Sequence, residues 1–465
     1  RLFMQASKKS WAEKAFSLSE NCKANVLLQS FKKNAAFATA GDTLFKKLKS
    51  FQKQIAVLET ALFDIQQWGD KNNPDIIRRL STQKDSLQNL QIQTETRLIN
   101  SNSIYQSLLR KENTVSLERM NDQLLQKNTA LLEYFSCDST QFVFLKEKDI
   151  PVKMVKINNG ATLLIDTFFS FLTNKEAILN NPLEYGKIAS NLFQLLQLNK
   201  ININTSNLII IPDEKICLVP FDALLTTSTG SLNIRQWPFA IKKFVINYAY
   251  SIATLMEQMG DHNNDINTAL AAYAPFNLQG KRKLSRLSNT EVELKEIQQQ
   301  FKNGYFYCDS AATLTNFRNS ISNAAIIHIA SHAFADEGNQ MQCGIEFFDS
   351  TLYLNELYAM KLNANLVVLS SCESGIGKIE KTEGAMSLAR GFYYAGAKNV
   401  ITSLWEVNDK STGQLFNIFY KEKYYEQYAA GLQKAKLVYL ENAGVENASP
   451  YYWASFIPIG YQVKP

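Results

Sequence analysis

The chain lacks most of the features that mark metal-bound, exported or membrane-spanning proteins. Its six cysteines form no CxxC pair, so their spacing predicts neither a zinc ribbon nor a disulfide framework, and no metal or cofactor is expected. No apolar run approaches membrane-spanning length, and no secretory signal is present. We therefore expect a cytoplasmic protein with free thiols, five of them small core residues. Since the chain begins at Arg1, we also expect it to be a fragment.

Basic clusters and nucleotide-binding loops are also missing. The net charge of +6 is spread over 465 residues without a dense Lys/Arg block, so a nucleic-acid surface is not indicated. Neither a GxxxxGK[ST] nor a GxGxxG loop occurs, which disfavours a nucleotide site. Hydrophobic residues make up 46% of the chain, as in ordinary globular proteins, and its length predicts two or three domains.

Residues 1–127 have the composition of an all-α region. Apolar residues recur in steps of three and four from Leu44 to Ile65, which predicts a long helix with a heptad seam. A turn is expected at Gly69–Pro74, followed by a second long helix from about Asp75 to Asn100 and by one or two shorter helices. The two long helices predict an antiparallel hairpin. Residues 12–27 resemble the last helix of a tetratricopeptide array, although an ordinary amphipathic helix fits them equally well.

From residue 128 onward, β-branched runs alternate with helical patterns, which predicts an α/β domain with a largely parallel sheet flanked by helices. In this interpretation Leu131–Phe135 ends the helical region. The expected strands are 141–145, 152–157, 207–211, 244–249, 269–274, 325–330, 366–369 and 399–404. The expected helices are 161–172, 181–198, 290–301 and 384–395.

Two of these strands run directly into candidate reactive side chains. The strand at 325–330 leads to His332, and the strand at 366–369 leads to Cys372. Ligands of open α/β sheets bind at the carboxyl ends of the strands. A histidine can act as a general base near neutral pH, and a thiolate is a strong nucleophile. The placement predicts a Cys/His dyad and hence a cysteine peptidase.

Other polar residues near these positions have simpler interpretations. His328 lies inside the apolar strand, so we expect it to be a core histidine with polar partners, and His262 lies in a polar loop. Asp336 and Glu337 fit a solvated loop better than a third catalytic member. Three acidic residues after the nucleophile could form a pocket for a basic side chain or serve as loop and helix-start residues. These residues are Glu373, Glu380 and Glu383.

The ordered motifs around the two strand ends resemble those of CHAT domains. They comprise His328-Ile-Ala-Ser-His332-Ala333, Val367-Val-Leu-Ser-Ser-Cys372-Glu-Ser-Gly, Glu383-Gly384, Leu388-Ala-Arg-Gly-Phe392-Tyr-Tyr-Ala-Gly396-Ala397 and Val400-Ile-Thr-Ser-Leu-Trp405-Glu-Val-Asn-Asp409. The likeness continues at residues 211–224 and 453–460. It spans about residues 128–465, the expected extent of the domain.

This resemblance implies a caspase-like, separase-related peptidase fold in which His332 is the catalytic histidine and Cys372 the nucleophile. It also implies an oxyanion hole made by the backbone amides of Ala333 and Cys372. Family members often have glycine where this chain has Ala333, a change that keeps the N–H and adds a methyl group. The resemblance further supports a tetratricopeptide-like end in residues 1–127, since such repeats often accompany CHAT domains.

Two functions remain open. The first is a cysteine endopeptidase that cleaves protein substrates and is regulated by a protein, or protein complex, bound to the helical region. The second is a scaffold whose peptidase domain is inert or only transmits a signal. Both catalytic positions are filled, and a degenerate domain commonly loses one of them, so the sequence favours the enzyme. No membrane partner is expected.

Overall fold

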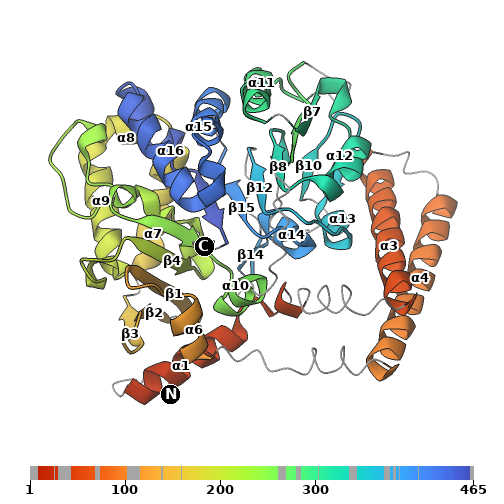
Figure 1. The fold of residues 1–465 in the computed structure, drawn as a ribbon, viewed down its shortest axis with the longest axis horizontal. Helices are drawn as coiled ribbons and strands as arrows, with labels where there is room; N and C mark the ends of the chain where they lie inside the picture. Colours follow the sequence, from red (N-terminus) through yellow and green to blue (C-terminus); the bar gives the residue numbers. More distant parts are fainter. Residues whose placement is uncertain are drawn as a thin grey trace.

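A computed structural model of the chain places a broad mixed sheet between layers of helices (Figure 1). It describes most of the chain in fifteen segments. These are residues 9–25, 27–29, 43–68, 74–101, 116–137, 140–158, 160–259, 269–278, 284–301, 303–334, 343–370, 378–380, 384–386, 388–406 and 408–460.

The central sheet has eleven strands in the order β3-β2-β1-β4-β5-β16-β15-β12-β8-β6-β7. In chain order the strands are β1 (Thr129–Cys137), β2 (Thr140–Glu147), β3 (Lys153–Ile157), β4 (Asn207–Ile211), β5 (Val245–Tyr248), β6 (Leu270–Ala274), β7 (Gly304–Cys308), β8 (Ile326–Ile329), β12 (Leu366–Leu369), β15 (Val400–Ser403) and β16 (Phe456–Ile459). Two small antiparallel sheets accompany it. They consist of β9 (Ala333–Phe334), β10 (Gly344–Glu346) and β11 (Thr351–Tyr353), and of β13 (Lys378–Glu380) and β14 (Gly384–Met386).

The C-terminal strand β16 marks the point at which the parallel strands of this sheet reverse direction. It pairs parallel to β5 on one side and antiparallel to β15 on the other. We call β1–β5 the first half and β6, β7, β8, β12 and β15 the second half. Within the second half all four neighbouring pairs are parallel. The carboxyl ends of β4 and β8 therefore lie at opposite edges of the sheet.

Helices cover both faces of the sheet, as expected when strands are buried on both sides. The α-helices of the sheet-bearing part are α7 (Ala161–Thr173), α8 (Ala177–Asn180), α9 (Pro182–Leu195), α10 (Ile252–Met259), α11 (Thr290–Gln300), α12 (Leu314–Ser320), α13 (Leu354–Ala359), α14 (Leu388–Ala395), α15 (Asp409–Lys421) and α16 (Tyr428–Asn442). Those before the sheet are α1 (Lys9–Cys22), α3 (Thr43–Trp68), α4 (Pro74–Ser101) and α6 (Leu117–Gln123). Short 3₁₀ turns are η2 (Leu198–Lys200), η3 (Glu214–Leu218), η4 (Phe221–Ala223), η5 (Ile234–Gln236), η6 (Ala240–Lys242), η7 (Asp309–Ala311), η8 (Ile321–Asn323), η10 (Tyr424–Gln427), η11 (Glu446–Ala448) and η12 (Pro450–Tyr452).

Helix α1 packs directly on the first half of the sheet. Its residue Phe16 is fully buried and meets Phe144 of β2 with ring centroids 5.7 Å apart. Side chains of α6 and α10 complete this apolar layer. Buried side chains of α7 and α9 belong to the larger core with the alternate residues of β1 and β4, so the first half is covered on both faces.

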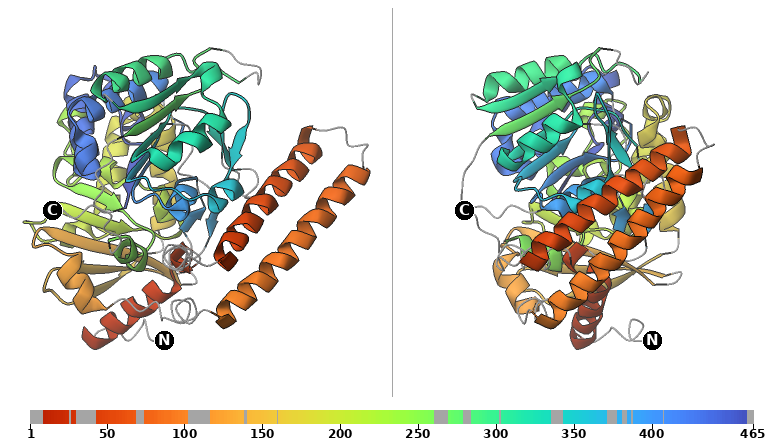
Figure 2. Two further views of the ribbon diagram at one scale, coloured as in Figure 1. Left: turned by 45° about the vertical axis from the view of Figure 1, so that its right-hand side comes forward. Right: turned by 90° about the vertical axis from the view of Figure 1, so that its right-hand side faces the viewer.

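The long helices α3 and α4 form a hairpin that stands beside the second half of the sheet (Figure 2). Helix α3 faces α13, and Phe63 of α3 meets Tyr353 with ring centroids 5.5 Å apart. Helix α4 lies on the outer side of α3 and buries little of its surface; Ile92, for example, is 62% exposed. The hairpin is thus attached through α3.

Most sequence-based elements are confirmed, including the sheet class, the two long helices and the strands that lead toward His332 and Cys372. The assignment of Leu131–Phe135 to the end of the helices is wrong, because these residues lie in β1 between β2 and β4. The predicted helix 384–395 is only partly right, since Gly384–Met386 is β14 and the helix begins at Leu388. The turn predicted at Gly69–Pro74 lies almost wholly outside the described residues.

None of the described helices combines the length and apolar composition needed to cross a membrane.

Candidate active site

His332 lies just beyond the carboxyl end of β8, where the buried strand gives way to β9. Its ring is half-buried and packs against Phe276, with ring centroids 5.2 Å apart. Nε2 lies 2.7 Å from the backbone carbonyl oxygen of Ser285 and 3.4 Å from the Ser285 hydroxyl. A carbonyl oxygen only accepts hydrogen bonds, so Nε2 carries the hydrogen in this contact. In the neutral ring Nδ1 is then left as the basic nitrogen.

The segment that follows Ser285 is anchored by two residues. Arg286 Nε donates to the carbonyl oxygen of Asn277, and Asn289 donates to Asp409 Oδ2 through its backbone N (2.8 Å) and its Nδ2 (2.9 Å). Asp409 begins α15 and closes one of the sequence motifs. These bonds hold the Ser285 carbonyl, and with it one side of the His332 ring.

Ala333 follows the histidine and lies in β9, opposite Ile345 of β10. The backbone N of Glu346 donates to the carbonyl oxygen of His332 over 2.9 Å. In an antiparallel ladder this bond makes Ala333 and Ile345 a non-hydrogen-bonded pair. The N–H of Ala333 therefore points away from β10, on the side where an acceptor outside this small sheet could reach it.

Cys372 lies outside the described residues, but the strand that leads to it does not. Strand β12 pairs in parallel with β8, with Leu369 opposite Ile329, and Ser370 N donates to the Ile329 carbonyl over 2.9 Å. The structure therefore brings together, as neighbours, the two strand ends from which the chain continues to His332 and to Cys372. Parallel neighbours present their carboxyl ends at the same edge of the sheet.

His328 is a buried histidine with polar partners, as predicted. Its ring is 0% exposed, Nδ1 lies 3.1 Å from the Tyr420 hydroxyl, and Nε2 lies 3.0 Å from Glu293 Oε1. Ser370 Oγ donates to the same carboxylate oxygen over 3.1 Å. The sequence interpretation missed Glu293, although a signal was present. In α11 this glutamate falls on the buried helical stripe formed with Thr290, Leu294 and Ile297.

The remaining acidic and histidine candidates are not positioned by the structure. His262, Asp336, Glu337, Glu373 and Glu383 lie outside the described residues. Only the backbone of Glu380 is described, in β13. A pocket for a basic side chain therefore stays a prediction.

The described cysteines offer no strong rival nucleophile at this edge, and they correct one expectation. Of the five, only Cys343 is buried; Cys22 is exposed, and Cys137, Cys217 and Cys308 are half-buried. The prediction of five core thiols is therefore wrong, because four of them lie at the borders of elements. Burial raises the pKa of the Cys308 thiol to about 11, which makes it a poor source of thiolate. Among the described residues, no group of three His, Cys, Asp or Glu side chains could hold a metal.

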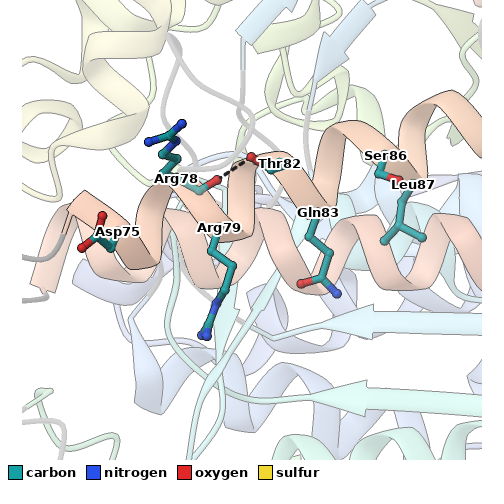
Figure 3. A pocket seen from close by; sticks show the side chains of 7 residues that line it. All are labelled: Asp75, Arg78, Arg79, Thr82, Gln83, Ser86 and Leu87. Atoms are coloured by element: carbon teal, nitrogen blue, oxygen red, sulfur yellow. Dashed lines mark hydrogen bonds between the residues drawn. The ribbon is translucent and has the colours of Figure 1, made fainter.

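A shallow depression on α4 is the other surface feature of note (Figure 3). It encloses about 540 Å³, and its described lining comes from this one helix. Arg78 and Gln83 extend from neighbouring turns, while Thr82 Oγ1 is bonded to the Arg78 carbonyl. Without polar groups converging from a second element, this depression has no features of a ligand site.

The chain is thus an α/β protein with a mostly parallel sheet, in which a histidine lies at one strand end and the neighbouring strand leads to a cysteine. The CHAT domain family model matches residues 186–461, more than half of the 465 residues, so the chain belongs to the CHAT domain family. Over 110 residues it is 32% identical to the mouse (Mus musculus) tetratricopeptide repeat protein 28. That match covers 23% of this chain and only 4% of the relative.

Solved structures of two peptidases are similar at low identity. The Saccharomyces cerevisiae separase–securin complex matches with a TM-score of 0.48 and 10% identity, over 84% of this chain and 34% of that one. The Arg-specific cysteine proteinase gingipain R of Porphyromonas gingivalis matches with a TM-score of 0.38 and 10% identity, over 59% of this chain and 66% of that one. Neither likeness is close enough to define how this chain works.

Proposed function

We propose that the protein is a cysteine endopeptidase in which Cys372 is the nucleophile and His332 the general base and acid. The observation that carries this proposal is the position of His332, half-buried at the carboxyl end of β8 beside the strand end that leads to Cys372. Membership of the CHAT family supports it. The reaction class is acyl transfer from a peptide bond.

The Ser285 carbonyl takes the orienting role that a carboxylate has in other nucleophile–histidine pairs. By accepting from Nε2, it fixes the ring and leaves Nδ1 to take the proton of the Cys372 thiol. A carbonyl dipole stabilises the imidazolium less than a full negative charge does. The dyad therefore depends on the thiolate and the imidazolium stabilising each other.

The chemical steps then follow from these groups. The Cys372 thiolate attacks the peptide carbon, and the N–H groups of Ala333 and Cys372 bind the oxygen that becomes negative. His332 gives a proton to the departing amine, which leaves a thioester. It next removes a proton from water, which cleaves the thioester and restores the thiol. The direction of the Ala333 N–H, away from β10, supports its proposed role in binding this oxygen.

A regulatory protein bound to the helical region, residues 1–127, would act through contacts that α3 already makes. Asn355 Nδ2 of α13 lies 3.2 Å from Glu59 Oε2 and 3.4 Å from the Ala56 carbonyl oxygen. Tyr353, which meets α3, ends β11, and β11 pairs through β10 with β9, where Ala333 lies. Movement of the hairpin would therefore reach the proposed oxyanion hole through one small sheet.

The alternative function is an inert scaffold, and a comparison of cleavage products separates the two. Wild-type protein and the Cys372→Ala and His332→Ala variants are incubated with native cell lysate, and new protein N-termini are identified by mass spectrometry. We expect a discrete set that forms only with the wild type. The same set from either variant would contradict the dyad. No new N-termini at all, with or without a binding partner, would favour the scaffold.

A further inference from the structure

A buried polar cluster lies directly behind the candidate site, and the proposed chemistry does not use it. It consists of Glu293, His328, Ser370 and Tyr420, all between 0% and 6% exposed. Taking a carboxylate out of water costs free energy unless it is well bonded, so the partners of Glu293 indicate what it does.

One oxygen of Glu293 holds both strands of the site. Oε1 lies 3.0 Å from His328 Nε2 and accepts a hydrogen bond of 3.1 Å from Ser370 Oγ. The other ring nitrogen of His328 lies 3.1 Å from the Tyr420 hydroxyl on α15. Edge-to-face contacts with Phe416 and Tyr420 hold the ring at 79° and 74° to its neighbours.

The two ends of this arrangement are placed close to the proposed dyad along the chain. His328 is in β8, four residues before His332, and Ser370 follows β12, two residues before Cys372. The backbone ladder already pairs β8 with β12 up to Ile329 and Leu369. At the end of this ladder the carboxylate of Glu293 links the two strands through side chains, since it contacts His328 of β8 and Ser370, which follows β12.

We propose that Glu293 is a positioning residue, whose carboxylate joins His328 to Ser370 and so fixes the relative position of the strand ends that lead to His332 and Cys372. This inference rests on the proposed function. The residue acts through the strands and does not touch substrate. An apolar side chain would fill the same space more cheaply, since a buried ion is often less stabilising than a well-packed hydrophobic residue.

Two substitutions of nearly equal shape test whether the hydrogen bonds matter. Glu293→Gln keeps an oxygen that can accept from Ser370 and lie beside His328 Nε2, whereas Glu293→Met fills the space without offering either residue that oxygen. The measurement is the rate at which iodoacetamide modifies Cys372 between pH 5 and 9, followed by peptide mass spectrometry. The exposed Cys22 of each sample is the internal reference.

We expect Glu293→Met to slow modification of Cys372 at pH 6.5 by about tenfold. A displaced imidazole stabilises the thiolate less, and each unit by which the pKa of the thiol rises cuts the thiolate fraction at this pH about tenfold. Glu293→Gln should stay within about threefold of the wild type, since both acceptor contacts survive. A role in packing alone would leave the two variants equal, and that result would overturn the proposal.

Ser370→Ala is a second, milder variant that tests the same link if Glu293→Met fails to fold. It removes only the link to β12 and leaves the His328 contact in place, so we expect a smaller slowing, about threefold, in a protein that stays folded but has a lower melting temperature. Glu296→Gln, on the same helix, is the matched control and should react like the wild type. Unchanged rates in both Glu293→Met and Ser370→Ala would contradict the proposal.

His332→Ala separates failure of this inference from failure of the proposed function. If Cys372 in the wild type reacts no faster than Cys22 and His332→Ala has no effect, the dyad itself is wrong. If His332→Ala slows Cys372 while the Glu293 and Ser370 variants do not, the dyad stands and the positioning role falls.

Discussion

The strand ends of the two sheet halves carry polar residues with different surroundings. After β4 in the first half, Asp213 is 1% exposed, and its carboxylate accepts from the backbone N of Ser136 (2.7 Å) and of Glu214 (3.1 Å). After β8 in the second half, His332 is half-buried, and within the described part of the chain its ring nitrogens are bonded on one side only, to Ser285. A side chain whose bonding capacity is used by backbone groups supports the fold. One that keeps a nitrogen available can do chemistry.

The halves also differ in how the helical elements attach to them. The end of helix α1 meets the first half through buried charges. Lys23, the residue after α1, bonds through Nζ to the Tyr134 carbonyl and lies 3.9 Å from Glu133 Oε1. Glu20 accepts from the first backbone N–H groups of α10, Ile252 and Ala253. The hairpin meets the second half through a few partly exposed contacts. One attachment belongs to the core, and the other is open to change.

The largest expected effect separates activity from stability at the two strand ends. We expect His332→Ala to lower peptide cleavage by about 10³-fold or more, as loss of the base of a catalytic pair does, with little change in melting temperature. Asp213→Ala should lower the free energy of unfolding by about 1–3 kcal/mol, because two backbone N–H groups lose their acceptor, with cleavage per folded molecule unchanged. Loss of activity in folded Asp213→Ala would break the comparison.

The second prediction concerns α1 on the first half. Burial raises the pKa of Glu133 well above its usual value, so this group can become neutral when its cation is removed. We expect Lys23→Met to destabilise the protein by about 1–3 kcal/mol, because the buried Tyr134 carbonyl loses its lysine donor. Thermal unfolding measures this. Lys14→Met, at an exposed position of α1, is the control and should change stability by less than about 0.5 kcal/mol. Equal effects of the two variants would show that α1 is not held by its buried charge.

The smallest effect concerns the hairpin on the second half. Burial, with Lys361 and Lys53 nearby, lowers the pKa of Lys49 to about 8. A lysine whose pKa is lower in the folded state binds fewer protons there, so stability should rise with pH from about 8 to its unfolded value near 10.5. Lys49→Met should flatten this rise and add about 1 kcal/mol at pH 7, after allowance for partial exposure.

Melting curves of the wild type and Lys49→Met at pH 7, 8 and 9.5 test this sign, with Lys47→Met, on the exposed side of α3, as the control. A rise in wild-type stability that persists in Lys49→Met would assign the titration to another group.

Several features of the fold could be predicted because they depend on local pattern. The heptad spacing of apolar residues predicted α3, and β-branched runs bounded by turns predicted β4, β8 and β12. The sequence pattern did not predict strand β1, because Glu133 interrupts its apolar run. That residue is accommodated in the core by Ser19 of α1, which bonds to it, and by Lys23, just after α1, which lies beside it; both are more than a hundred residues away in the chain.

The candidate site was predictable in the same limited sense. His332 was identified from its place after an apolar run, since a parallel strand directs its carboxyl end to the site edge. The Ser285 carbonyl could not be identified that way, because a backbone oxygen carries no sequence signal. Glu293 falls on the apolar stripe of α11, which indicates burial, but that pattern does not show which residues it contacts.

The sequence by itself determined most of the elements, the family resemblance and the candidate pair, because periodicity and motif order are local properties of the chain. Only the tertiary structure decided that the sheet reverses direction at β16 and that β8 and β12 are neighbours. It also decided that His328 and Ser370 share one oxygen of Glu293. These are contacts between segments far apart in the chain, and hydrogen-bond geometry and burial select them only after the strands have assembled.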